Sequence, residues 1–199
     1  VYKRQVVLDF AKNAQVSLVD YEPQGTDFIR SYVPVPKTDP WAIRQAATLI
    51  NNAKRPFILV GQGVELGGAQ EEVRQLIERA DIPAGCTLLG LSALPSDHPL
   101  NMGMLGMHGS LANSIKTQEC DVLIAVGMRF DDRITGKLST YARQAKKIHF
   151  EIDPSEINKN VPVDVAVLGN CKQTLAQVLE QVKPNRHTDW IDSFGKHHE

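Results

Sequence analysis

The chain has 199 residues, of which 42% are hydrophobic and 23% are charged, and its formal net charge is −1. This composition is ordinary for a soluble globular protein, and the net charge gives no basic field that would favour nucleic acid as a partner. The longest apolar runs, such as FILVG and DVLIAVG, are too short to span a bilayer.

The first part of the chain predicts a strand, a linker and a helix. Val6–Phe10 (VVLDF) predicts a short buried strand, and Gly25–Asp39, which holds two prolines and no helical period, predicts an extended linker. Asp39-Pro40 is typical of a helix start, because an N-cap acid precedes a proline at the first helical position. The apolar spacing then predicts a helix over Trp41–Ala53.

Strands and helices alternate from there to about residue 183. Strands are predicted at Phe57–Val60, Ile82–Ala84, Asp121–Val126, Lys147–Ile152 and Asp164–Leu168, and helices at about Gly68–Ala80, Leu111–Thr117 and Gln173–Lys183. Leu91–Gly103 is predicted to be a loop. This spacing is typical of βαβ units, so we expect an α/β fold with a doubly wound, mainly parallel, Rossmann-like sheet of about six strands and helices on both faces.

The stretch from Leu105 to Arg133 concentrates the charged and glycine-rich motifs. In Gly106-Met107-His108-Gly109, the glycines give the backbone close access to a planar ligand, and the alternative is a loop histidine without a role. A buried strand then ends in a run that contains Gly127, Arg129, Asp131, Asp132 and Arg133. Arginine forks bind phosphate or carboxylate, so we interpret this run as an anion clamp; the alternative is a solvated loop with weak surface ion pairs.

Further candidates follow other strands, where ligands bind in such sheets. Gly61-Gln62-Gly63 fits a phosphate contact or simple turn chemistry equally well. Thr87-Leu88 could hold the edge of a flavin or nicotinamide, or form a structural turn. Glu151 fits a ribose hydroxyl and Asn170 an adenine edge, and helix capping is the alternative for each.

Other catalytic chemistries lack their residues. No Ser-His-Asp or Cys-His set has a suitable spacing, and no Gly-Asp-Gly followed by Asn, the magnesium-binding pattern of thiamine diphosphate sites, occurs. His108 has no second His or Cys at a ligand spacing, so no metal site is predicted. The three widely spaced cysteines fit a reducing compartment, and we expect a cytoplasmic protein.

Two motifs together resemble a known family. Met104–Gly109 (MLGMHG) and Val126–Arg133 (VGMRFDDR) are similar to the central domain of the acetohydroxyacid synthase (acetolactate synthase) catalytic subunit. Supporting matches are Arg55-Pro56 before a strand that ends in Gly-Gln-Gly, and the HFEIDP run of His149–Pro154. The resemblance extends from Val6 to about Val182.

The resemblance implies a subunit in which the first and third domains bind thiamine diphosphate and Mg²⁺ across a dimer interface, while the middle domain binds FAD. It implies condensation of pyruvate with a second 2-keto acid, pyruvate or 2-ketobutyrate, with loss of CO₂, in branched-chain amino-acid biosynthesis. A homodimer or tetramer, a small regulatory subunit and a bacterial-type cytoplasmic location are also implied.

The resemblance further divides the chain into the tail of the first domain with a linker (residues 1–38), the central domain (39–183) and the start of the third (184–199). The chain begins without Met and ends inside a predicted helix, so we expect a fragment of a longer protein. The fragment should be inactive alone, because it lacks the thiamine site. Alternatives are the middle domain of another thiamine enzyme, of the glyoxylate carboligase or pyruvate oxidase type, and a non-catalytic nucleotide-binding module.

Carried over by position, the resemblance assigns two kinds of site residue. Arg133 would receive the carboxylate of the second keto acid, with Asp132 as its counter-charge. Tyr2 and Asn170 stand where the family has Arg and Asp, respectively. FAD contacts are implied for Gly61, Gly63, Thr87, Leu88, Met107, His108, Gly109, Gly127, Arg129, Asp131, Glu151, Ile152 and Asn170.

Overall fold

The computed structural model describes residues 7–22, 25 and 33–196, and the chain divides into two units, residues 1–32 and 33–199. In the first unit, the described residues are all exposed and form one short helix, α1 (Lys12–Val16). The strand expected at Val6–Phe10 is not formed by the described residues 7–10, so that prediction is wrong. A strand needs a hydrogen-bonded neighbour, and the described part of this unit offers none. Tyr2 lies outside the described residues.

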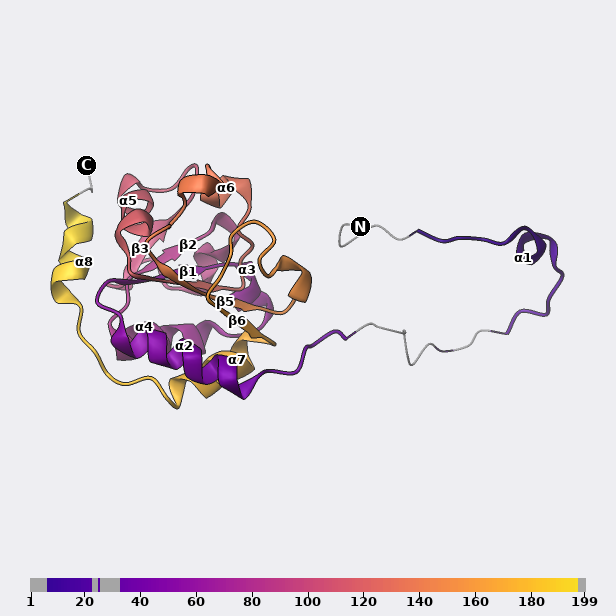
Figure 1. Cartoon of the computed structure of the whole chain (residues 1–199), viewed down its shortest axis with the longest axis horizontal. Helices are drawn as coiled ribbons and strands as arrows, with labels where there is room; N and C mark the ends of the chain where they lie inside the picture. Colours follow the sequence, from indigo (N-terminus) through magenta and orange to yellow (C-terminus); the bar gives the residue numbers. More distant parts are fainter. Residues whose placement is uncertain (1–6, 23–24, 26–32, 197–199) are drawn as a thin grey trace. The chain divides into compact units, whose positions relative to one another are not determined.

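The second unit is built on a six-stranded sheet whose neighbouring strands all pair in parallel (Figure 1). The order along the sheet is β3-β2-β1-β4-β5-β6. The strands are β1 (Pro56–Val60), β2 (Ala84–Cys86), β3 (Asn101–Met104), β4 (Val122–Val126), β5 (Lys146–Glu151) and β6 (Val165–Leu168). The chain therefore reverses its direction of travel across the sheet between β1 and β4, and an α/β fold with a doubly wound, Rossmann-like sheet is confirmed.

Helices cover both faces of this sheet, so its central strands alternate between two apolar cores. Ile58 and Val60 pack into the core beneath α2 (Pro40–Asn52), α4 (Gln70–Ala80) and α7 (Cys171–Leu179). Phe57 and Leu59 pack into the core on the other face, beneath α5 (Leu111–Glu119) and α8 (Thr188–Gly195). Figure 1 shows α2, α4 and α7 grouped on one side of the sheet. Burial on both faces explains why these strands are continuous apolar runs.

Most sequence-predicted elements of the second unit are confirmed, but three features differ. β3 overlaps the end of the predicted loop Leu91–Gly103 and continues to Met104. It was not predicted, because its sequence NMGM has neither an apolar run nor a clear alternation. β2 begins only at Ala84, where the expected strand ends. A separate helix, α3 (Gln62–Leu66), precedes α4, and Gly68 in the left-handed region at φ +63° stands between them. The remaining short helices are α6 (Asp132–Thr135), η1 (Leu88–Ala93), η2 (Leu138–Thr140) and η3 (Pro154–Glu156).

The helix start at Asp39-Pro40 is also confirmed. The Asp39 side chain accepts a hydrogen bond from Trp41 N at 2.8 Å, and Pro40 is the first helical residue. At the other end of the chain, α8 packs on the second face, where Trp190 Nε1 donates to Pro56 O at 2.8 Å.

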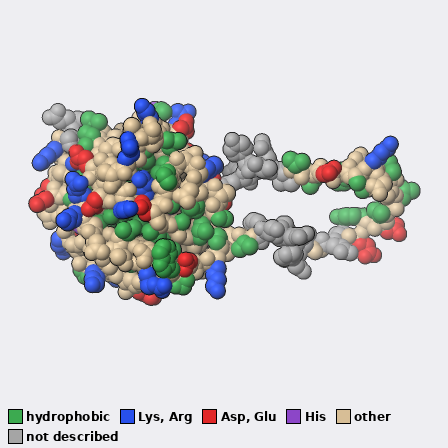
Figure 2. All heavy atoms as spheres, in the orientation of Figure 1, with side chains coloured by type: hydrophobic (Ala, Val, Ile, Leu, Met, Phe, Trp, Pro, Cys, Tyr) green, Lys and Arg blue, Asp and Glu red, His purple; other side chains and the backbone are tan. Residues whose placement is uncertain are grey.

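Charge is mixed on the face of the second unit that the space-filling view shows. On the face of the second unit shown in Figure 2, basic and acidic side chains are interspersed rather than gathered into a field of one sign. This pattern agrees with the net charge of −1. Within the described residues, none of the helices combines the length and the apolar character needed to cross a membrane.

Candidate functional site

The predicted site residues lie at one edge of the sheet. Each of them is the last residue of a strand or follows the carboxyl end of one within a few residues. Because all six strands run parallel, these ends share one edge. Five inter-strand steps of about 4.8 Å make this edge about 24 Å long. A ligand that contacts all the predicted residues must therefore be elongated.

At the switch point between β1 and β4, three glycines allow two backbone segments to touch. A Cβ atom on Gly61 would lie 2.3 Å from Gly127 O, and one on Gly127 would lie 2.7 Å from the Gly63 backbone. Gly61 N donates to Val126 O at 2.9 Å, and Gly63 N donates to Gly127 O at 2.8 Å. Both amides of the Gly-x-Gly turn are thus used inside the protein. The turn-chemistry interpretation explains these glycines, and their amides are not free to bind a phosphate.

The two family motifs contact each other. Met107 N donates to Arg133 O at 2.8 Å, and Arg133 Nη1 lies 3.6 Å from Met107 Sδ. Gly106 has φ +94°, and a Cβ there would lie 2.7 Å from Arg133 O. The loop after β3 and the start of α6 therefore form one surface, although they are more than twenty residues apart in sequence.

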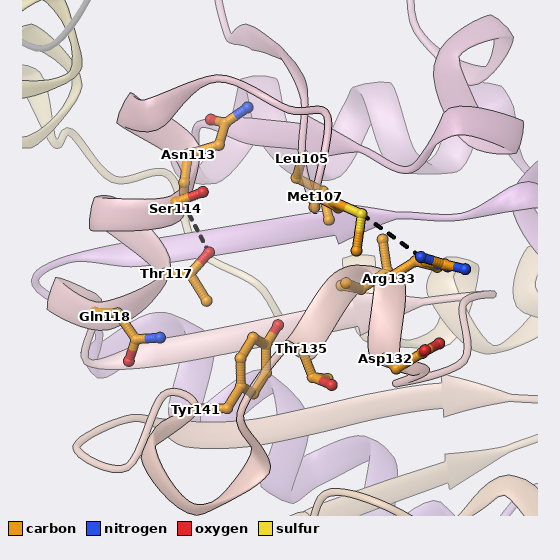
Figure 3. Close-up of a pocket in the computed structure, with 13 residues that line it drawn as sticks. Leu105, Met107, Asn113, Ser114, Thr117, Gln118, Asp132, Arg133, Thr135 and Tyr141 are labelled. Atoms are coloured by element: carbon orange, nitrogen blue, oxygen red, sulfur yellow. Dashed lines mark hydrogen bonds between the residues drawn. The ribbon is translucent and has the colours of Figure 1, made fainter.

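A first cavity of about 350 Å³ lies beside this surface (Figure 3). Thr117 and Gln118 of α5 stand on one side of it, and Asp132 and Arg133 of α6 on the other. Tyr141 also lines it, and its hydroxyl is buried without a hydrogen-bond partner among the described residues. Burial raises the pKa of Tyr141 well above its ordinary value. The cavity combines apolar and polar walls with the cation of Arg133, and such walls suit a small anionic molecule with an apolar part.

A second cavity of about 430 Å³ lies next to the first and has more apolar walls. It brings three predicted cofactor residues, Leu88, Met107 and His108, together with Arg133, and all three are exposed. Arg133 thus borders both cavities. The walls are Leu88, Met104, Leu105, Met107, His108, Arg133 and Ile134. A flat apolar group is the ligand that such walls suit best.

The charged loop after β4 forms one ion pair. Arg129 Nη2 lies 3.7 Å from Asp131 Oδ2, with both side chains substantially exposed. An exposed pair at this distance contributes little stability, so Arg129 is free to exchange Asp131 for another anion. Among the described residues, no ion pair joins Asp132 to Arg133, whose guanidinium lies beside Met107 instead. The structure therefore does not place Asp132 as the counter-charge of Arg133.

The polar side chains at the ends of β5 and β6 accept hydrogen bonds from nearby backbone amides. Glu151 is buried, and its Oε1 accepts from Ile152 N at 3.0 Å and from Asp153 N at 3.1 Å. Asn170 is the N-cap of α7, where its Oδ1 accepts from Lys172 N at 2.9 Å. Neither residue borders the two cavities described above. The capping interpretation thus describes Asn170, and of this group only Ile152 presents an exposed side chain.

The backbone amides of Thr87 and Gly109 both donate hydrogen bonds within the protein. Thr87 N donates to Val60 O at 2.9 Å, which ties the end of β2 to the end of β1. Gly109 N donates to Gly106 O at 2.9 Å and closes the turn around His108. His108 is exposed on that turn and faces the second cavity.

Two residues that the sequence analysis did not assign to the site hold the loop after β4. His149 Nε2 lies 2.8 Å from Met128 O, and Asn160 Nδ2 donates to Phe130 O at 2.8 Å. His149 could have been noticed as a polar residue inside an apolar strand, whereas Asn160 carries no signal of its contact across the fold.

The cysteines and potential metal ligands are not gathered. Cys86, Cys120 and Cys171 are free and buried, and burial raises the pKa of Cys86 and of Cys171 to about 11. In the described part of the chain, no group of three or more His, Cys, Asp or Glu side chains is placed to hold a metal ion.

Comparison with known proteins identifies a family and several relatives that this chain resembles. The sequence profile described as "Thiamine pyrophosphate enzyme, central domain" matches residues 43–178. The chain is 44% identical over 178 residues to a "Probable acetolactate synthase large subunit" of Methanocaldococcus jannaschii, which covers 87% of this chain and 30% of the relative. It is 41% identical over 185 residues to the "Acetolactate synthase isozyme 2 large subunit" of Escherichia coli, and the match covers 93% of this chain and 32% of the relative.

A third relative is the "Acetolactate synthase large subunit" of Corynebacterium glutamicum, 39% identical over 192 residues that cover 94% of this chain and 31% of the relative. The chain therefore spans about a third of the length of these relatives.

Proposed function

The chain belongs to the thiamine pyrophosphate enzyme family, whose central domain it contains, and we propose that it is the FAD-binding central domain of an acetolactate synthase large subunit. The whole protein would condense pyruvate with pyruvate or 2-ketobutyrate, with loss of CO₂, in branched-chain amino-acid biosynthesis. The similarity to acetolactate synthase large subunits over most of the chain supports this proposal. The contact between the MLGMHG and RFDDR motifs supports it further, since these motifs mark the family resemblance.

The elongated carboxyl edge of the sheet is the observation that carries the FAD proposal. The second cavity, against Leu88, Met107 and His108, suits the flat flavin ring at one end of this edge. Arg129 follows β4, near the middle of the edge, and its weakly held guanidinium suits the diphosphate. The adenosine half would then lie toward β5, where Ile152 is exposed.

Arg133 is proposed to receive the carboxylate of the second keto acid. Its guanidinium borders both cavities, so an acid bound there would lie beside the flavin ring. A planar guanidinium binds a carboxylate with two parallel hydrogen bonds, which also orient the acid. Asp132 lines the first cavity beside Arg133.

Thiamine diphosphate and Mg²⁺ are proposed to bind elsewhere in the whole protein, because the chain holds no Gly-Asp-Gly…Asn pattern. We therefore expect the 199-residue chain to make no acetolactate from pyruvate, even with thiamine diphosphate, Mg²⁺ and FAD added. Detection of acetolactate by a colorimetric assay would contradict this expectation. A homodimer or tetramer, a small regulatory subunit and a cytoplasmic location are further proposals that rest on the resemblance.

Titration of the chain with FAD tests the proposed cofactor. The wild-type chain should quench flavin fluorescence on binding, and Arg129→Ala should bind about tenfold or more weakly, the loss expected for a charged hydrogen bond. Arg143→Ala is a matched control, because Arg143 is exposed and precedes β5 at the opposite edge of the sheet. Equal affinity of wild type and Arg129→Ala would contradict the clamp.

The same titration separates the rival functions. A non-catalytic nucleotide-binding module would bind ATP or NAD as tightly as FAD, whereas the proposed domain should prefer FAD. The rival thiamine enzymes of the glyoxylate carboligase or pyruvate oxidase type receive less support, since the relatives named above are acetolactate synthases. The keto-acid specificity of the whole protein would decide that question.

A further inference from the structure

The loop between β4 and α6, residues 127–131, has an alternating pattern of burial. Met128 and Phe130 are buried, at 4% and 5% exposure, while the Arg129 side chain between them is 58% exposed. The carbonyl groups of the two buried residues are the ones held by His149 and Asn160, each at 2.8 Å. The backbone is thus fixed immediately before and immediately after Arg129.

The hydrogen bond defines the protonation of His149. A carbonyl oxygen only accepts hydrogen bonds, so Nε2 must carry the hydrogen that faces Met128 O. Burial lowers the pKa of His149, although the Met128 carbonyl and the carboxylates of Glu151 and Glu156 oppose that shift. Nδ1 is buried and has no partner among the described residues. The Glu151 carboxylate also lies near the ring, with Oε2 3.7 Å from Nε2. The contacts around the ring therefore place its hydrogen on Nε2, toward the loop that it holds.

Packing around the ring restricts it further. The Phe130 ring meets the His149 ring nearly edge-on, with ring centroids 5.0 Å apart. The Tyr141 ring also packs edge-on with Phe130, with ring centroids 6.1 Å apart. His149 is fully buried, so it cannot touch a ligand at the sheet edge. Its effect on binding passes through its neighbours, which are the loop and the buried carboxylate of Glu151, whose Oε2 lies 3.7 Å from Nε2.

We propose that His149 and Asn160 are positioning residues, which fix the backbone on both sides of Arg129 and thereby aim its guanidinium at an anionic cofactor. This inference rests on the proposed function, because it assumes that Arg129 binds the FAD diphosphate. A backbone that is already held in its binding position loses less conformational freedom when the ligand arrives. The two hydrogen bonds therefore increase affinity without touching the ligand.

Two substitutions at His149 in the 199-residue chain separate the hydrogen bond from packing. His149→Gln keeps an N–H donor at about the same distance from the backbone, while His149→Leu removes it. With FAD as the titrant, His149→Leu should bind about fivefold more weakly, which corresponds to the roughly 1 kcal/mol of one neutral hydrogen bond. His149→Gln should stay within about twofold of wild type, since the donor is restored. Equal weakening by both variants would overturn the hydrogen-bond role.

A double-mutant cycle tests whether the effect passes through Arg129. The proposal routes the effect of His149 through that arginine and not through the neighbouring Glu151, so Arg129→Ala/His149→Leu should bind FAD no more weakly than Arg129→Ala alone. Additive losses would overturn the proposal. Asn160→Leu, which keeps about the same side-chain shape and removes the donor to Phe130 O without adding charge, gives the same test if His149→Leu does not fold.

The failure of this inference and the failure of the proposed function have different signatures. If the wild-type chain does not bind FAD, the proposed function is overturned. If wild type binds FAD and Arg129→Ala binds weakly, but His149→Leu and Asn160→Leu bind like wild type, only the positioning role is overturned.

Discussion

At the scale of single residues, the direction in which a polar side chain turns decides whether it is available to a ligand. Glu151 accepts two amides of its own chain and Asn170 caps α7, while Arg129 is held only by an exposed ion pair. The sequence predicted that all three would lie at strand ends, which is correct. It could not predict which of them are engaged, because capping and ligand binding use the same residue types in the same places.

His149 makes folding stability depend on pH. Its folded pKa is lowered from 6.5 by burial, so the unfolded chain binds the proton more readily than the folded chain. The stability that the neutral ring contributes is therefore present above pH 6.5 and is lost as the pH falls below that value toward the folded pKa. Urea unfolding should show that the free energy of unfolding falls more between pH 7.5 and pH 5.5 for wild type than for His149→Gln, because glutamine does not titrate. Equal losses of unfolding free energy in the two proteins would show that the pKa of His149 is not lowered in the folded chain.

At the scale of elements, the sequence was most informative where burial is complete. β1 and β4 are buried along their whole length, so their apolar runs were recognisable without the structure. β3 was missed because it is a partly buried end strand of the sheet, and its sequence has no apolar pattern. The contact between the β1–α3 turn and the end of β4 was also unpredictable, because it joins glycines that are distant in sequence.

This glycine contact makes a stability prediction. Gly127→Ala should destabilise the chain by about 2 kcal/mol or more, since the added Cβ would lie 2.7 Å from the Gly63 backbone and the left-handed φ of +57° adds strain. Gly68→Ala is the matched control: its φ of +63° is similar, but a Cβ there meets nothing within 4 Å. Gly68→Ala should therefore cost only the backbone term of about 1 kcal/mol. If chemical denaturation gives the same loss of unfolding free energy for both variants, the glycine contact does not contribute to stability.

At the scale of the whole molecule, the sheet order converts scattered motifs into one surface. Residues that follow β2, β3, β4 and β5 meet along the carboxyl edge because the strands are parallel, and the order reverses between β1 and β4. The α/β class followed from the alternation of elements in the sequence. The order itself and the two cavities beside Arg133 depend on long-range packing, which no local pattern contains.

The central claim is that an elongated cofactor, FAD, lies along this carboxyl edge. The most direct test is to follow the backbone amide resonances of the 199-residue chain by NMR while FAD is added. The amides of Leu88, Arg129 and Ile152 should shift together, since they follow three different strands at the predicted edge, while those of Arg55 and Lys146 at the amino edge should not. Shifts confined to the amino edge, or no shifts at saturating FAD, would contradict the account.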